Sequence, residues 1–227
     1  MRRLSDRRVA TIFALVLASG FCFGLVWLRA WRTGSNDYGF LVWNLELAWI
    51  PFFVALAFYD SWRRGRPRWL LVALGSLWLL FLPNAPYMVT DLIHLGRISG
   101  APLWYDGAMI SAFAGTGLLL GLGSVFLVHT VALRTLGSRL GWAVLLPVLA
   151  LCSAGVVLGR FARLNSWDAL VRPGRLVEFI AAHAADPLAS RRALAATAGY
   201  AVFLVLAYVV LYTVSSLRPD FEPDRRR

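Results

Sequence analysis

Charged residues are scarce in this sequence, and lysine is absent from it. Of the 227 residues, 15% are charged and 59% are hydrophobic, whereas charged residues make up about 25% of an average soluble domain. So little charge excludes a single soluble domain, and so large a hydrophobic content excludes a disordered chain. All 23 basic residues are arginine, and the 12 acidic residues leave a formal net charge of +11.

The excess of arginine would suggest a nucleic-acid partner if the protein were soluble. Here, however, the arginines cluster beside long apolar stretches, where they orient a membrane protein and meet anionic headgroups. We therefore predict that the chain has the lipid bilayer as its partner and does not bind nucleic acid.

Cysteine is also rare. The two that are present, Cys22 and Cys152, both lie in apolar stretches, and the HExxH zinc motif is absent. Both thiols are therefore predicted to be small core residues rather than a disulfide or a metal pair. No metal site is predicted, and the sequence specifies no cofactor.

Long apolar stretches are abundant instead. About 20 residues of helix cross the roughly 30 Å hydrocarbon core of a bilayer, and these stretches are continuous rather than alternating like the strands of a membrane barrel. We predict an all-α integral membrane protein, a bundle of about six transmembrane helices forming one domain over residues 1–227. The spans are expected at residues 9–28, 40–59, 69–82, 108–133, 141–159 and 196–217.

Arginine is distributed unevenly between the two sides of this bundle. Six spans place both termini on one side, where 14 arginines lie, against 9 on the other side. Because cytoplasmic loops carry an excess of basic residues, both termini are expected in the cytoplasm.

The third span is short. Its 14 residues rise about 21 Å as helix, and it runs into the sequence PNAPY at residues 83–87. Two prolines three positions apart end or break a helix, so we expect a broken or re-entrant segment at residues 83–95. Asn84 is expected to cap a second short helix there. One face of that helix would carry Tyr87, Asp91 and His94 at spacing i, i+4 and i+7.

Two other segments have recognisable patterns. The fourth span contains Gly117-x-x-x-Gly121, a pattern that lets helix backbones approach closely, so we expect this span at the centre of the bundle. Near residues 173–186, apolar and charged side chains alternate at helical spacing, which predicts an amphipathic helix on the extracytoplasmic surface.

Ten polar residues fall at the outer level of the expected bundle. Glu46 is the deepest of them, about 10 Å inside its span, where an isolated charge is costly. We expect Glu46 to pair with Arg160, Arg163 or Asn84, and we expect the segment 160–168 to approach the segment 84–94. The ten residues are Asn44, Glu46, Asn84, Asp91, His94, Asp106, Arg160, Arg163, Asn165 and Asp168.

Four runs of the sequence carry a family resemblance: Asn44–Pro51, Leu80–Leu95, Trp104–Asp106 and Gly159–Asp168. They resemble a bacterial family of multi-pass membrane proteins, domain of unknown function 1361, from about the second span to the sixth. The resemblance implies an integral protein of the bacterial cytoplasmic (inner) membrane. It implies no activity.

The polar residues have two interpretations, a site or a scaffold. Paired arginines suit a phosphate, so a site would act on or bind a phosphate-bearing lipid headgroup or another anionic envelope precursor. As a scaffold, the same residues would form a salt-bridge network that holds re-entrant backbone. The catalytic candidates are Glu46, Asp91, His94, Asp106 and Asp168, and the substrate-binding candidates are Asn84, Tyr87, Arg160, Arg163 and Asn165.

Three functions therefore stay open. An enzyme at the extracytoplasmic face would need these carboxylates in one cavity. An ion-coupled transporter would use Glu46 and Asp91 along a polar path that continues to the cytoplasmic side. A non-catalytic envelope assembly or partner protein would present an exposed apolar or aromatic groove.

Overall fold

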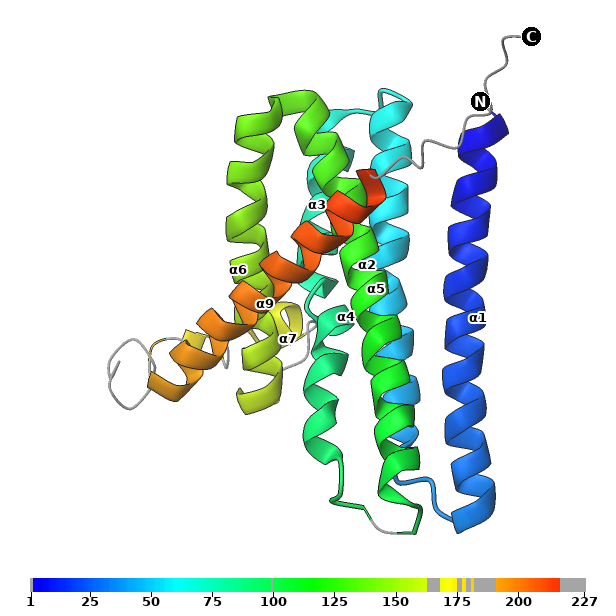
Figure 1. The fold of residues 1–227 in the computed structure, drawn as a ribbon. Coiled ribbons are helices and arrows are strands. Elements are labelled where there is room, and N and C mark those ends of the chain that lie inside the picture. Colours follow the sequence, from blue (N-terminus) through cyan, green and yellow to red (C-terminus); the bar gives the residue numbers. More distant parts are fainter. Residues whose placement is uncertain are drawn as a thin grey trace, which may run out of the picture.

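Helices make up the fold of this chain (Figure 1). The computed structural model describes residues 2–98, 100–162, 168–174, 177–178, 181 and 191–216. Six helical segments within this part are long and apolar enough to cross a membrane, which confirms the predicted all-α membrane bundle. The elements are α1 (Arg2–Thr33), α2 (Gly39–Arg63), α3 (Arg68–Phe81), α4 (Asn84–Tyr87), the 3-10 helix η1 (Met88–His94), α5 (Leu103–Leu136), α6 (Ser138–Ala162), α7 (Asp168–Val171) and α9 (Arg191–Ser216).

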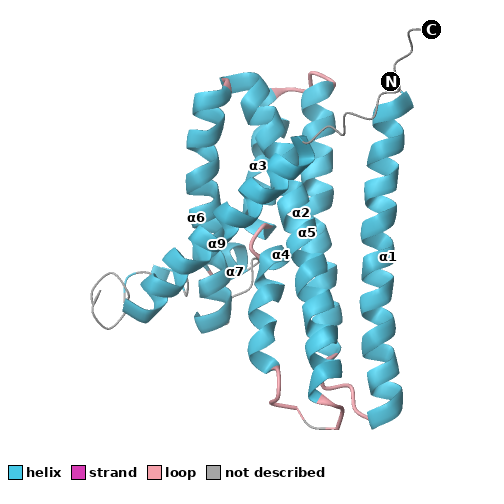
Figure 2. Cartoon of the chain, in the orientation of Figure 1, coloured by secondary structure: helices cyan, strands magenta, loops and turns pink. Residues whose placement is uncertain are grey.

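The turns of the chain gather at the two ends of the bundle (Figure 2). Pro67 and Pro102 directly precede α3 and α5. Proline is favoured at the start of a helix, because the backbone N–H that it lacks would have no partner there. Gly137 ends α5 with a φ of +81°, a conformation that is strained for residues with a side chain. The start of α1 and the end of α9 lie at the same end of the bundle (Figure 1).

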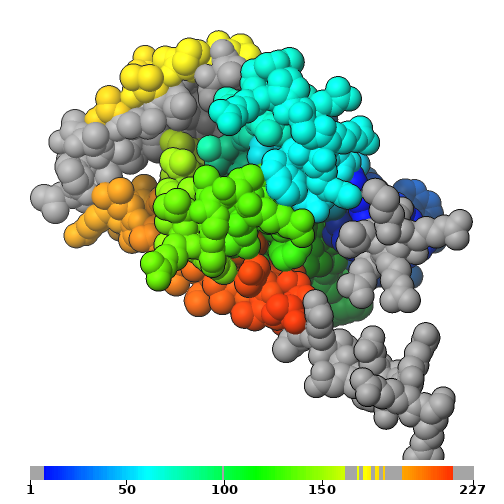
Figure 3. All heavy atoms as spheres, turned by 90° about the horizontal axis from the view of Figure 1, so that it is seen from above, coloured from blue at the N-terminus to red at the C-terminus, as the bar shows by residue number. Residues whose placement is uncertain are grey.

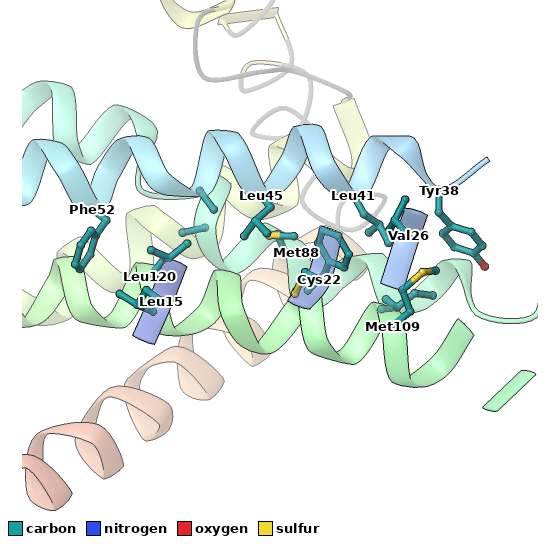
Figure 4. Close-up of a cluster of buried hydrophobic side chains, with 14 of the residues drawn as sticks. Leu15, Cys22, Val26, Tyr38, Leu41, Leu45, Phe52, Met88, Met109 and Leu120 are labelled. Carbon is teal, nitrogen blue, oxygen red and sulfur yellow. The ribbon is translucent and has the colours of Figure 1, made fainter. Parts of the chain in front are cut away.

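The fourth expected span, α5, is the central helix. It packs against α1, α2, α6, α9 and both parts of the broken segment, which confirms its expected position. α9 crosses α5 and α6 diagonally (Figure 1). On the side facing α1 and α2, apolar side chains fill the core (Figure 4). Cys22 lies in that core, Cys152 lies in a second one, and both are free and buried, as predicted.

The broken segment completes the third span. α3 ends at Phe81, and α4 and η1 then continue toward the end of the bundle opposite the start of α1 (Figure 1), so that one candidate span runs from Arg68 to His94. The helix breaks after Phe81, where a broken segment was expected. The second half of this segment is a 3-10 helix rather than the α-helix that was expected.

Side chains bind the backbone carbonyls at this break. Asn84 donates its Nδ2 to the carbonyl of Phe81 at 3.0 Å, so it closes the end of α3 instead of capping the next helix as expected. The hydroxyls of Thr90 and Tyr200 donate to the carbonyls of Tyr87 and Pro86, both at 2.6 Å. These bonds provide the partners that backbone groups need inside a membrane.

Glycines on α5 and α6 make room for the broken segment. A Cβ added at Gly117 would lie 2.8 Å from the carbonyl oxygen of Ala85 and 2.6 Å from the sulfur of Met88. At Gly155 it would lie 2.5 Å from Pro83. The small residues of α5 thus let α4 and η1 approach its backbone closely. The contact at Gly117 leaves no room for even one added methyl group.

Gly117→Ala is therefore expected to lower the free energy of unfolding by about 1–3 kcal/mol, the usual range for overpacking a dense core. Unfolding in mixed detergent micelles measures the change. Gly115→Ala is the matched control, because a Cβ at this exposed position of the same helix meets nothing within 4 Å. Equal losses in the two variants would show that the close approach at Gly117 contributes nothing.

Candidate functional site

Asp91 is the buried centre of a polar cluster toward the end of the bundle opposite the start of α1. It lies on η1 with its side chain 2% exposed. Asn44 of α2 donates its Nδ2 to Oδ2 of Asp91 at 2.9 Å. Arg160, two residues before the end of α6, donates its Nη2 to Oδ1 at 2.6 Å. One carboxylate therefore joins three elements that are far apart in the sequence.

Three further side chains position the guanidinium of Arg160. Its Nε and Nη2 donate to Oγ1 of Thr90 at 3.0 and 2.6 Å. Its Nη1 lies 3.3 Å from Nε2 of His94, and its central carbon lies 4.7 Å from the ring centroid of Tyr87. A guanidinium only donates hydrogen bonds, so this contact requires an unprotonated Nε2 on His94.

The name Arg160 cluster is used below for Asn44, Tyr87, Thr90, Asp91, His94 and Arg160. Although four side chains hold it, Arg160 remains 21% exposed. Its Nη1 carries two N–H groups, of which one points to His94, and the part of the chain that the structure describes offers no acceptor for the other. The cluster can therefore donate a charge-assisted hydrogen bond to an oxygen that arrives from the outer surface.

A second polar cluster lies nearby, and of its residues the sequence prediction named only Asp106. Arg29 of α1 donates its Nε and Nη2 to the two carboxylate oxygens of Asp106 on α5, at 2.7 and 3.3 Å. The two side chains are 1% and 2% exposed. The guanidinium of Arg29 also lies 4.4 Å from the ring centroid of Tyr38. This ion pair ties α1 to the central helix.

Tyr38 lies between the two clusters. Its hydroxyl is 3.5 Å from Oδ2 of Asp106 and 3.4 Å from the carbonyl oxygen of His94. Burial, and then the charge of Asp106, raise the pKa of the Tyr38 phenol. The phenol therefore keeps its proton over a wide pH range and donates to one of these oxygens at a time.

The expected approach of the segments 160–168 and 84–94 is confirmed for Arg160, which contacts Asp91. Arg163 and Asn165, two of the predicted substrate-binding residues, lie outside the described residues. The predicted amphipathic helix near residues 173–186 also lies largely outside them. Asp168 is buried at the start of α7.

The expected pairing of Glu46 with Arg160 or Asn84 was wrong, and its third expected partner, Arg163, lies outside the described residues. The structure places its side chain on the exposed surface of α2. Two of its expected partners are engaged elsewhere, Arg160 with Asp91 and Asn84 with the carbonyl of Phe81. Glu46 follows Asn44 by two positions, about 200° around a helix, so it faces away from the cluster that Asn44 enters.

Three of the four candidate carboxylates, Glu46, Asp91 and Asp106, therefore do not form one group. Asp91 and Asp106 belong to separate ion pairs, and Glu46 faces outward. Among the described residues there is no group of three or more histidine, cysteine, aspartate or glutamate side chains that could hold a metal ion.

Sequence reasoning missed Arg29, Tyr38 and Thr90. Arg29 was counted as a residue of the outer side, although it lies a full turn before the end of α1. An arginine inside a helix-forming stretch needs a carboxylate partner, and that signal was available. The hydroxyls of Tyr38 and Thr90 carry no comparable signal in the sequence.

A family model described as "Protein of unknown function (DUF1361)" matches residues 43–214. The chain belongs to this family. The match confirms the resemblance seen in the sequence and includes the whole Arg160 cluster, whereas Arg29 and α1 precede it. No curated protein and no solved structure matches the chain significantly.

Proposed function

We propose that this membrane protein binds the anionic headgroup of a phosphate-bearing lipid or envelope precursor at the Arg160 cluster, without catalysing its turnover. The guanidinium of Arg160 carries the proposal, because four side chains orient it, one of its N–H groups has no acceptor among the described residues, and the side chain is partly exposed. Arginine pre-organised in this way binds phosphate oxygens with little loss of side-chain entropy.

A second cation supports this proposal. Arg97, three residues after His94, is exposed and close enough for its charge to act on the His94 ring. Its backbone N–H donates to the carbonyl of His94 at 3.2 Å. Asp91 neutralises Arg160, so Arg97 supplies the net positive charge that an anion needs beside the cluster.

Asp91 and Asp106 are already paired with arginines, and this favours binding without catalysis over the other two functions. A hydrolase needs a general base, but Asp91 and Asp106 are each held by an arginine. A carrier that uses Glu46 and Asp91 needs both on one path, yet α2 directs Asn44 toward Asp91 and Glu46 to the opposite side.

Short-chain phosphatidylglycerol, titrated onto the purified protein in neutral detergent, tests the proposal. Binding to the wild type should raise Tm, whereas phosphatidylcholine should not. Arg97→Gln should weaken phosphatidylglycerol binding several-fold without loss of stability, because the side chain is exposed. Arg160→Gln should weaken it at least tenfold, which corresponds to about 1.4 kcal/mol.

Arg8→Gln is the control for nonspecific charge, since Arg8 is exposed at the opposite end of the bundle and pairs with Asp60. Its affinity for phosphatidylglycerol should equal that of the wild type. The proposal is contradicted if Arg97→Gln and Arg160→Gln also bind like the wild type, or if Arg8→Gln weakens binding as much as they do.

We further infer that the protein is a bacterial inner-membrane protein with cytoplasmic termini and an extracytoplasmic Arg160 cluster. The arginine distribution supports this orientation. Gly65 lies in the turn between α2 and α3, at the end of the bundle opposite the cluster. Since Cys22 and Cys152 are buried, a cysteine introduced at Gly100 should react with an impermeant maleimide in intact cells. One introduced at Gly65 should react only in opened cells, and the reverse result would invert the orientation.

A further inference from the structure

Glu46 is a carboxylate on a surface that is otherwise apolar. It lies about 10 Å from the outer end of α2, and its side chain has no hydrogen bond or ion pair with any described residue. Other exposed or partly exposed side chains continue the same strip of α2 at helical spacing, namely Trp43, Ile50, Phe53 and Ala57. Trp43 and Phe53 are 56% and 54% exposed. An ionised carboxylate on a lipid-facing strip requires a cation.

Arg32 is a cation at the same end of the bundle as Glu46, on a different face of the molecule. It is exposed in the last turn of α1, and its side chain has no hydrogen bond or ion pair with any described residue. Ser19 of α1 contacts Trp49 of α2, and Arg32 lies about 220° further around the helix. It therefore faces away from α2 of its own chain. α1 itself lies at the edge of the bundle (Figure 3).

The strip of α1 that carries Arg32 complements the strip of α2 that carries Glu46. Toward the inner side, Arg32 is followed by Leu28, Gly24, Phe21 and Leu17. Phe21 and Leu17 are 62% and 58% exposed, and a Cβ added at Gly24 would meet nothing within 4 Å. In an antiparallel alignment, Gly24 would face the bulky Phe53 region and Phe21 would face Ala57.

The directions of the two charged side chains also converge. Side chains on a helix lean toward its N-terminus. The N-terminus of α2 is at the outer end, so Glu46 leans outward, and that of α1 is at the inner end, so Arg32 leans inward. The lean narrows the difference in depth between the carboxylate of Glu46 and the guanidinium of Arg32.

We propose that a second copy of this chain covers the Glu46 strip, with α1 of one copy packed against α2 of the next and Arg32 of one copy paired with Glu46 of the other. The two surfaces lie on different faces of one molecule, so the contact is heterologous and builds a closed ring or a chain of copies. The contact does not involve Arg160 or the binding of an anion, and it stands or falls independently of the proposed function.

Full-length protein with donor and acceptor labels, reconstituted in neutral lipid, tests the contact by energy transfer between copies. The wild type should associate. Glu46→Arg alone and Arg32→Glu alone should each weaken self-association at least tenfold, because each brings like charges together at the contact. Mixing the two variants should restore association to within about threefold of the wild type, since each then supplies the charge that the other lacks.

Arg139→Glu is the matched control, an exposed charge in the first turn of α6 that belongs to neither strip, and it should leave self-association unchanged. Both test positions are exposed, and an unaltered Tm confirms that the variants fold. A monomeric wild type, single variants that still associate, or a mixture that fails to associate would each overturn the proposal. Phosphatidylethanolamine binding that depends on Glu46 in a monomeric protein would assign the strip to a lipid amine instead.

Discussion

Alanine in place of Asp106 is expected to lower the free energy of unfolding by about 3–5 kcal/mol, the usual effect of removing one partner of a buried ion pair. The side chains of Arg29 and Asp106 are 1% and 2% exposed, so the guanidinium left behind would have little access to water. Unfolding in mixed detergent micelles measures the loss. Asp60→Ala provides the control within the same chain.

The Arg8–Asp60 pair has a similar donor–acceptor distance, 2.8 Å, but side chains that are 40% and 29% exposed. Its loss should change stability by no more than about 1 kcal/mol. Replacing the buried pair by apolar residues, Arg29→Met with Asp106→Leu, should recover much of the stability lost in Asp106→Ala. If the double variant is less stable than Asp106→Ala, the ion pair does more for the fold than cancel two buried charges.

Asp91→Ala is expected to lower the free energy of unfolding by about 2–3 kcal/mol, less than Asp106→Ala, because Arg160 is partly exposed and water can solvate it. The variant should also lose affinity for phosphatidylglycerol, since Asp91 orients the guanidinium that binds it. Asp91→Asn keeps an oxygen for the N–H groups of Asn44 and Arg160, so it should lose less stability.

A double-mutant cycle with Arg160→Met isolates the coupling between Asp91 and Arg160. We expect a coupling energy of about 1–3 kcal/mol, as for residues in one hydrogen-bonded network. The Arg29–Asp106 pair provides the comparison, because its loss should reduce stability without changing phosphatidylglycerol affinity in the fraction that remains folded. Additive effects of Asp91→Ala and Arg160→Met would contradict the positioning role assigned to Asp91.

The number of spans, their approximate positions and the place of the break could be predicted from the sequence. The free energy of transferring a helix into hydrocarbon depends on the side chains of that helix alone. The position of each span can therefore be predicted from its own stretch of sequence. Pro83 and Pro86 remove backbone donors within one turn, and their effect is equally local. The sequence also placed Asp91, His94, Asp106 and Arg160 at one end of the bundle.

Only the tertiary structure decided which charges pair. Arg29 and Asp106 are 77 positions apart, and Arg160 and Asp91 are 69 apart, so each pair depends on how two helices are rotated about their axes. The packing of other side chains sets that rotation. Gly117 and Gly155, for example, must face the broken segment, because the close approach there needs a residue without a side chain. The same rotation directs Asn44 inward and Glu46 outward, although both lie on one turn of α2 at nearly equal depth. Hydropathy determines how deep a residue lies, whereas the direction in which it faces is a property of the packed bundle.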